Sequence, residues 1–583
     1  MPEKTFRHLA FLVLVMVLGG CVSPAFSGEP QGVPPLKVVY FTPSDRSPAP
    51  DRQERLGRVM KNIQDFYRKG MEANGHGSKT FALEWETPEK LRLYDVKGRR
   101  KLTDYPKGTE WVVYDEVREV LKQKGIDIQS EYVLILGVWV DWNRGVAKEY
   151  GPYSGGGNIF SGFAFACEDK LIDADLLSSQ EPGGYHYLIH GGQCSLGMYN
   201  TLYIGGIAHE LGHAFGVPHD CQRDAETESH GISLMANGNH YYGKASRGEG
   251  RDAFLSAATA MRLSVSRAFD PDYAKYPHET IPWMIQDFDA SFRDRKLNLT
   301  GKSVSDPVPQ GIIVYNDNEN AGGDYDAKTW VTIPAETGDF RFEIDELERV
   351  PYEMRLVAVF PGGVTDEISL HYSNTSGTPT VESIDMALAR NEINAGLDLQ
   401  DWDKVAGILE SQIKKFPNNT ILARKLKHLE TVKNPPTAFE PDKVSSDENK
   451  VDLTYAKALE ARVGWYEPSR GILRECGFLE VGGTFHESGI YAHPNSLHAF
   501  SLGKKWKEFS FEYGIQDGKP GTVVFVVRAD GKAIFRSGTV KKGETHTKKL
   551  DVSNVDKLEL ITEDAGDGWA NDWGLWLNPQ LSR

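Results

Sequence analysis

The chain has 583 residues, which is too long for a single domain. Its apolar fraction of 40% and charged fraction of 25% are those of an ordinary soluble protein. The formal net charge of -16 argues against nucleic acid or anionic lipid as a partner, because both are negatively charged.

Residues 1–21 have the pattern of an export signal. A short basic region precedes an apolar run over residues 9–18, which is too short to span a bilayer. The run ends in Leu18-Gly19-Gly20-Cys21, which resembles a bacterial lipobox. That resemblance implies an exported lipoprotein, periplasmic or at the cell surface, held on a membrane by lipidated Cys21. The alternative is an ordinary secretory signal with an incidental cysteine.

Over residues 36–270 the hydrophobic pattern predicts alternating strands and helices. We expect buried strands at residues 36–41, 80–85 and 132–140, with helices at 51–70 and 111–124 between them. Residues 155–166 are either an edge strand above a cleft or a plain loop. Helices at 201–215 and 253–269 complete the region.

One stretch of this region, residues 207–220, contains several residues that could bind a metal ion or transfer a proton. His209 and His213 are four residues apart, so on a helix they share one face and can hold one metal ion. Glu210 stands beside them as a candidate base. Gly216 permits a sharp turn that would return His219 toward the other two imidazoles. Three neutral nitrogen ligands with one open position are typical of a catalytic zinc site.

The string HExxHxxGxxHD, followed by Ser233-Leu234-Met235, resembles the metzincin metallopeptidases. The resemblance implies an α+β catalytic domain, a twisted sheet with an active-site helix, over residues 36–270. It also implies zinc on His209, His213 and His219, Glu210 as general base, and Met235 as the Met-turn. The astacin-like branch has a tyrosine where this chain has Asn237, which argues against that branch. Asp220 resembles the adamalysin and snapalysin-like branches.

Further candidates surround this motif. Tyr241 and Tyr242 could line a substrate pocket or stabilise an oxyanion. Three acidic residues after His219 could bind calcium, although a solvated acidic loop is the simpler interpretation: Asp224, Glu226 and Glu228. An exported protein permits disulfides, so one pair is expected among three cysteines, without a choice of pairing: Cys167, Cys194 and Cys221.

The second half of the chain changes character. Alternating segments over residues 281–375 predict an Ig-like β-sandwich. Residues 381–433 have amphipathic helical periodicity and predict a helical hairpin that acts as a spacer. A polar, proline-containing linker at residues 434–450 follows.

Residues 449–583 resemble the NPCBM family of carbohydrate-binding β-sandwich modules, which accompany glycoside hydrolases. The resemblance lies in the stretches around Tyr491-Ala-His493-Pro-Asn495 and Trp569-Ala-Asn571-Asp572-Trp573. Aromatic faces stack on sugar rings, and polar groups bind hydroxyls. The candidate carbohydrate-binding residues are Tyr491, His493, Trp569, Asp572 and Trp573, and for each aromatic residue the alternative is an ordinary core position.

The sequence therefore predicts a multidomain, surface-anchored zinc endopeptidase directed to proteins or glycoproteins by a carbohydrate-binding module. Two alternatives remain: a non-catalytic glycan-binding adhesin that retains a metal site, and a zinc-dependent sugar amidase. An intact Glu210 counts against the adhesin, since a protein without activity has no need of its base.

Overall fold

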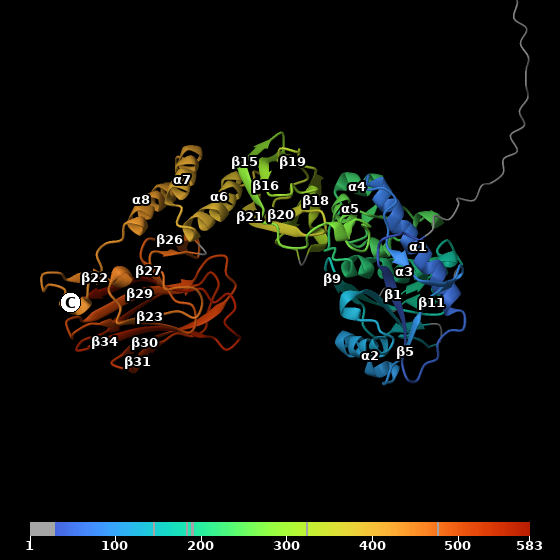
Figure 1. Ribbon diagram of the computed structural model, residues 1–583, viewed down its shortest axis with the longest axis horizontal. Coiled ribbons are helices and arrows are strands. Elements are labelled where there is room, and N and C mark those ends of the chain that lie inside the picture. Colours follow the sequence, from blue (N-terminus) through green and yellow to red (C-terminus); the bar gives the residue numbers. More distant parts are fainter. Residues whose placement is uncertain (1–28, 144–145, 182–184, 188–191, 322–323, 475–476) are drawn as a thin grey trace, which may run out of the picture. The chain divides into compact units, whose positions relative to one another are not determined.

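The computed structural model describes residues 29–143, 146–181, 185–187, 192–321, 324–474 and 477–583 (Figure 1). The predicted signal, with Cys21, lies outside these residues. Residues up to 278, with 361–363, form one compact unit, and residues 279–360 with 364–583 form the second. Within the described residues, we find no helix with the length and hydropathy that a membrane span requires.

A six-stranded sheet organises the first unit. Its order is β2 (Ala82–Leu83), β1 (Pro35–Thr42), β6 (Tyr132–Gly137), β10 (Gly162–Cys167), β9 (Ser154–Gly157), with β5 (Tyr94–Lys97) also paired to β1. β1, β6 and β10 are parallel, and β9 runs antiparallel to β10. β1 and β6 occupy the buried strands predicted at 36–41 and 132–140, and their continuous apolar runs suit a sheet covered on both faces.

Helices α1 (Arg52–Ala73) and α2 (Glu110–Gln123) connect the parallel strands, and α3 (Leu196–Ala214) follows them. The Tyr67 hydroxyl of α1 donates a hydrogen bond to the Ala208 carbonyl of α3 at 2.8 Å. The predicted last helix is shorter than expected, since α5 (Ala257–Ser264) begins where the Ser256 side chain caps Thr259 N. Residues before it form β14 (Ala253–Phe254), paired with β13 (Ile232–Ser233).

Smaller elements complete the first unit. β7 (Val140–Asn143), β8 (Val146–Glu149), β11 (Tyr185–Tyr187) and β12 (Gly192–Cys194) form a four-stranded sheet, and β3 (Trp85–Thr87) pairs with β4 (Lys90–Leu91). α4 (Asp224–Ser229) and the short 3₁₀ helix η4 (Gly238–His240) lie after α3 in the sequence.

Residues 155–166 form most of two strands, the edge strand β9 and the interior strand β10, so the loop alternative is wrong and the edge-strand prediction holds only for β9. β9 lies in direct contact with α3. A Cβ atom on Gly155 would collide with the Glu210 carbonyl, and one on Gly157 or Gly162 would collide with the Ala214 carbonyl. Glycine is therefore required at these positions for the strand to reach the helix.

The expected disulfide is absent: no disulfide joins any two of Cys167, Cys194 and Cys221. They lie on different elements, at the end of β10, in β12 and after α3. Burial raises the pKa of the Cys167 and Cys194 thiols, which favours the protonated form.

The second unit begins with two antiparallel sheets. The first is β15 (Met284–Arg293), β16 (Lys296–Val304) and β19 (Asp339–Ile344). The second has the order β18 (Lys328–Thr332), β17 (Gly311–Asn318), β20 (Pro351–Val359), β21 (Thr365–Ser373). Apolar side chains alternate along these strands, as the predicted sandwich requires.

Three helices, rather than the predicted hairpin, follow: α6 (Val381–Asp398), α7 (Trp402–Lys415) and α8 (Thr420–Lys433). Helix α6 ends before α7 because Gln400 adopts a left-handed conformation, with φ 58°. Asp401 then caps α7. The helices share a hydrophobic core with Ile472, Phe478 and Phe485 of the C-terminal domain. They are part of that domain's packing and not a free spacer.

The C-terminal domain is built on two antiparallel sheets around Phe509, Phe525 and Trp576. One has the order β22 (Lys450–Asp452), β35 (Gly574–Ser582), β29 (Glu508–Ile515), β33 (Thr545–Asp551), with β27 (Gly489–Tyr491) on β35. The other has the order β23 (Glu460–Arg462), β28 (Ser496–Ser501), β34 (Lys557–Asp564), β30 (Thr522–Ala529), β31 (Lys532–Arg536), with β32 (Val540–Lys541) on β30. A further small sheet contains β24 (Ile472–Leu473), β25 (Gly477–Val481) and β26 (Thr484–His486).

The contact between β9 and α3 predicts unequal effects of two adjacent substitutions. Gly157→Ala should destabilise the full-length protein by about 1–3 kcal/mol, because the new methyl group meets a helix carbonyl that cannot rotate away. Gly156→Ala is the matched control, since its Cβ would lie 3.6 Å from the Phe163 ring, an ordinary contact. Thermal denaturation of both variants measures the difference, and equal midpoints would contradict the proposed contact.

Candidate functional site

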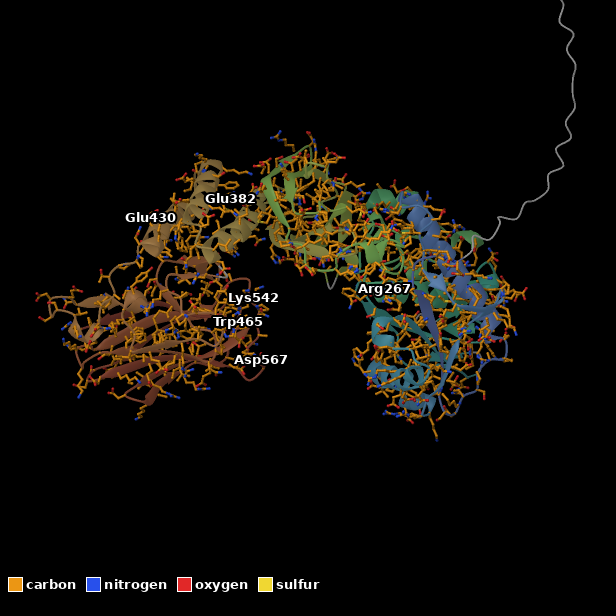
Figure 2. The ribbon with its side chains drawn as sticks, in the orientation of Figure 1. Arg267, Glu382, Glu430, Trp465, Lys542 and Asp567 are labelled. Carbon is orange, nitrogen blue, oxygen red and sulfur yellow. The ribbon has the colours of Figure 1, made fainter. Side chains whose placement is uncertain are left out.

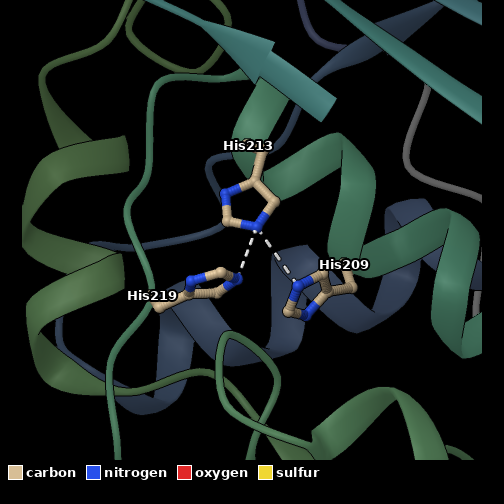
Figure 3. Close-up of side chains that lie close together, drawn as sticks. All are labelled: His209, His213 and His219. Atoms are coloured by element: carbon tan, nitrogen blue, oxygen red, sulfur yellow. Dashed lines mark hydrogen bonds between the residues drawn. The ribbon is translucent and has the colours of Figure 1, made fainter. Parts of the chain in front are cut away.

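Three histidines of the first unit converge on one point (Figure 3). Ser195 caps α3 by accepting a hydrogen bond from Met198 N, and the helix places His209 and His213 one turn apart. Beyond the end of α3, Gly216 adopts φ 82° and turns the chain, which brings His219 next to His213. The Nε2 atom of His213 lies 3.2 Å from that of His209 and 3.0 Å from that of His219. The sequence-predicted ligands are thus brought together.

Backbone carbonyls orient two of these imidazoles. His209 Nδ1 lies 2.7 Å from the Leu234 carbonyl, and His213 Nδ1 lies 2.9 Å from the Val217 carbonyl. A carbonyl only accepts, so each Nδ1 carries the proton and each Nε2 is left free to bind a metal. Burial lowers the pKa of His209 to about 3 and also lowers that of His213, which keeps both rings neutral. The donor set therefore fits a divalent metal that prefers imidazole, zinc among them.

Glu210 is half-buried beside the first of these ligands. Burial raises the pKa of its carboxyl group to about 7. A metal cation on the neighbouring imidazoles would oppose this shift by favouring the carboxylate. The group is thus well suited to exchange a proton near neutral pH.

Asp220, which directly follows His219, has a structural role that the sequence pattern did not reveal. Its fully buried carboxylate accepts hydrogen bonds from the hydroxyl groups of Ser233 and Ser256, and from Thr259 Oγ1 at 2.8 Å. These bonds join the His219 loop to β13 and α5. Met235 is fully buried, and its sulfur occupies the space that a side chain on Gly212 of α3 would fill. Both features fix the segments that surround the three histidines.

The two tyrosines after Met235 do not share one role. Tyr242 is only 4% exposed, and its hydroxyl donates to Asn62 Oδ1 at 2.7 Å. This residue belongs to the core, so its assignment to a substrate pocket is wrong. Tyr241 is half-buried and lies under Lys244, whose Nζ is 4.0 Å from the ring centroid.

The structure gives no support to calcium binding by the acidic segment after His219. Asp224 and Glu226 lie in the first turn of α4, where Glu226 accepts from Arg223 at 2.8 Å. Among the described residues, the three histidines alone form a group that could hold a metal ion. The acidic residues belong to the short helix α4 and not to the loop that was expected.

The candidate carbohydrate residues of the C-terminal domain divide between core and surface. Tyr491 and Trp573 are buried, with stacked rings whose centroids are 5.3 Å apart. His493 and Asp572 are also buried, and Asp572 Oδ1 accepts from Thr522 N at 2.8 Å while Oδ2 has no partner among the described residues. Burial raises the pKa of Asp572 to about 6. Trp569 is 61% exposed, so it is the one large aromatic surface of this set.

Two exposed aromatic residues that the sequence analysis missed lie beside this set. Trp465 and Tyr466 are 56% and 46% exposed. Their loop is tied to the candidate residues, because Gly464 N donates to the His493 carbonyl at 3.1 Å and Tyr491 donates to the Trp465 carbonyl at 3.2 Å. Figure 2 labels Trp465 and Asp567 on this domain. Consecutive aromatic residues next to a glycine were the available signal.

Comparison with known proteins bears on both regions. Residues 449–582 match the model of the NPCBM/NEW2 domain. The C-terminal domain is an NPCBM domain. No curated protein matches the chain.

Two similar solved structures are of OgpA from Akkermansia muciniphila. The wild-type protein is 23% identical, with a TM-score of 0.50, over 58% of this chain and 93% of that one. The catalytically inactive protein in complex with an O-glycopeptide substrate is 22% identical, with a TM-score of 0.50, over 62% of this chain and 98% of that one. At this identity the likeness shows a shared fold.

The histidine arrangement predicts that the purified protein binds zinc and that His213→Ala loses it. His213 is the central ligand, with its Nε2 close to the other two, and its removal leaves an incomplete donor set. Elemental analysis after dialysis against a weak chelator measures the zinc content. The control is His230→Ala, at the end of α4, which should bind as much zinc as the parent. A full zinc content in His213→Ala would contradict this ligand set.

Proposed function

We propose that this protein is a surface-anchored, zinc-dependent endopeptidase of the metzincin type that cleaves glycosylated proteins or peptides. The observation that carries the proposal is the convergence of three imidazoles, two of them oriented by backbone carbonyls, next to the half-buried carboxyl group of Glu210. This is the donor set and the base that metal-assisted hydrolysis of an amide requires.

Each residue has a separate task in the reaction. His209, His213 and His219 would hold zinc, which supplies a Lewis acid for the scissile carbonyl and lowers the pKa of water toward ~7. Glu210 takes the proton of the attacking water and returns it to the leaving amine. The Leu234 and Val217 carbonyls keep the ligand rings in the tautomer that the site needs.

The substrate backbone would bind along the edge of the sheet. Among the described strands, β9 pairs with β10 alone, which leaves the hydrogen-bonding groups of its other edge for an added strand. Gly155 of β9 lies against the Glu210 carbonyl and the His213 Cβ atom, so an extended peptide at this edge would lie beside the helix that carries the histidines. A sugar amidase has no use for such an edge, and we therefore favour a peptide substrate.

Glycosylated substrates are supported by two observations. The NPCBM domain presents the exposed rings of Trp465, Tyr466 and Trp569, which suit stacking on sugar rings. OgpA, which shares the fold, was solved with an O-glycopeptide. Attachment to a membrane through lipidated Cys21 completes the proposal and rests on the lipobox motif.

Glu210→Ala should abolish cleavage while zinc content and thermal stability stay near those of the parent, because Glu210 transfers protons and is not a ligand. The assay is digestion of a mixed proteome, including mucin-type glycoproteins, with new termini identified by mass spectrometry, with and without chelator. Normal turnover by this variant would contradict the proposed mechanism. If the parent protein with full zinc generates no new termini, the proposed function itself is wrong.

Trp569→Ala should slow cleavage of a mucin-type glycoprotein by about tenfold or more, since tethering raises the local concentration of scissile bonds. It should leave cleavage of a short unglycosylated peptide unchanged. The matched control is Ile534→Ala, an exposed apolar residue on β31 of the same domain. An unchanged ratio of the two rates in Trp569→Ala would show that this surface does not direct the enzyme to its substrate.

A further inference from the structure

The C-terminal domain carries a concentration of positive charge in an otherwise acidic protein. Residues 532–549 contain six lysines and arginines and one acidic residue, whereas the whole chain has a formal net charge of -16. All six basic residues are exposed. We call this set the basic stripe: Lys532, Arg536, Lys541, Lys542, Lys548 and Lys549.

The basic stripe follows the edges of the two sheets of this domain. β31 and β32 both pair with β30, and β33 is the outermost strand beside β29. The Lys548 Nζ atom of β33 is 5.7 Å from the centroid of the Phe535 ring of β31. That ring is in turn 5.7 Å from the Phe511 ring of β29. The positive charges of the two edges therefore share one side of the sandwich.

The strand register spreads these charges into a row. Lys532 lies opposite the last residue of β30 and Lys541 opposite the first, with Arg536 between them. At about 3.3 Å per residue, the two ends of this row are about 23 Å apart. A single small anion cannot reach along such a row, whereas a chain that carries repeated negative groups can.

Most of these charges have no acidic partner within the protein. Arg536 pairs with Glu563 at 2.7 Å. Lys549 pairs with Glu508 at 3.3 Å. Glu544, the one acidic residue of the segment, accepts a hydrogen bond from a backbone amide of its own turn at 3.1 Å. Four side chains have no carboxylate of the described residues within ion-pair distance: Lys532, Lys541, Lys542 and Lys548.

The partner that fits this row is a thin polymer with negative groups along its length. A membrane surface or a rigid duplex would also approach the acidic remainder of the chain, which repels it. A single glycan chain on the stripe interacts mainly with the stripe, because charges beyond about 8 Å are screened at physiological salt. The stripe also starts beside the proposed sugar-binding rings. Thr522, opposite Lys541, donates hydrogen bonds to Asp567, two residues before Trp569 (Figure 2).

We propose that the basic stripe binds anionic glycans of the substrate, that is, sugar chains that carry carboxylate or sulfate groups. This inference rests on the proposed function and deepens it, because it names a class of substrate. Binding by the stripe requires neither zinc nor Glu210. Binding and cleavage can therefore be measured separately.

The binding test uses the full-length protein with chondroitin sulfate, polysialic acid and neutral dextran, measured by calorimetry. The first probe carries sulfate and carboxylate groups, and the second carries carboxylate groups alone. The stripe variant combines Lys532→Gln, Lys541→Gln and Lys548→Gln. It should bind the anionic glycans about tenfold or more weakly at low salt, because neutralising a polyanion releases counterions and each lost contact removes part of that gain.

The matched control removes the same amount of charge from the first unit. It combines Lys101→Gln, Lys122→Gln and Lys124→Gln, which are all at exposed positions. This control should bind the glycans as the parent does. Thermal denaturation of both triple variants checks that they are folded, and dextran should bind to neither more weakly than to the parent.

Weaker binding by the stripe variant alone supports the proposal, and the comparison of the two anionic probes shows whether sulfate is required. Parent-like binding by the stripe variant, an equal loss in the control, or no binding by the parent overturns it. Tighter binding of phosphatidylserine vesicles or duplex DNA than of either glycan overturns the choice of partner. A zinc-loaded parent that binds the glycans and cleaves nothing supports the stripe as a glycan-binding surface and contradicts the endopeptidase function.

Discussion

The hydrogen bond between His209 and the Leu234 carbonyl is the constraint on which the arrangement of the three histidines depends. It joins the helix that carries two imidazoles to the segment after the third. Three imidazole nitrogens facing one point gain nothing from one another, so the surrounding protein must hold them there. Asp220 does so on one side, through three hydroxyl groups, and Met235 does so against Gly212 of α3. The site is rigid because its supports are buried.

The convergence of the three histidines could be predicted from the sequence because its geometry is local. A spacing of four on a helix and a glycine at the turn determine where the rings point, with little help from distant residues. Asp220 was missed as a contributor for the opposite reason. Its role depends on hydroxyl groups of Ser233, Ser256 and Thr259, which lie 13 to 39 residues later in the chain. A one-dimensional pattern does not record such contacts.

The C-terminal half shows the same limit. Periodicity indicated that residues 381–433 are helical with an apolar face, but not which surface covers that face. The covering surface is Ile472, Phe478 and Phe485, so the helices pack against the NPCBM domain through an apolar cluster of their own. The polar linker at residues 434–450 also contacts the NPCBM domain, because the Pro441 carbonyl accepts a hydrogen bond from Trp506 Nε1 at 3.1 Å. The strands of both sandwiches were easier to anticipate, since alternation by two and turn residues are local signals. Tyr491 and Trp573 occupy the core positions that were the alternative for each aromatic residue, and the motif alone could not decide between core and surface because burial is not visible in it.

The glycines of β9 have a further consequence. A strand that reads Ser-Gly-Gly-Gly presents a neighbour with amide and carbonyl groups and with almost no side chains. A chain lying along such an edge is held by interactions that every peptide can make, whatever its residues. Selectivity among polypeptides would then come from features other than the strand, such as glycans on the substrate and their binding by the NPCBM domain. A peptide bound along β9 in the proposed reaction would therefore be held with little regard to its sequence.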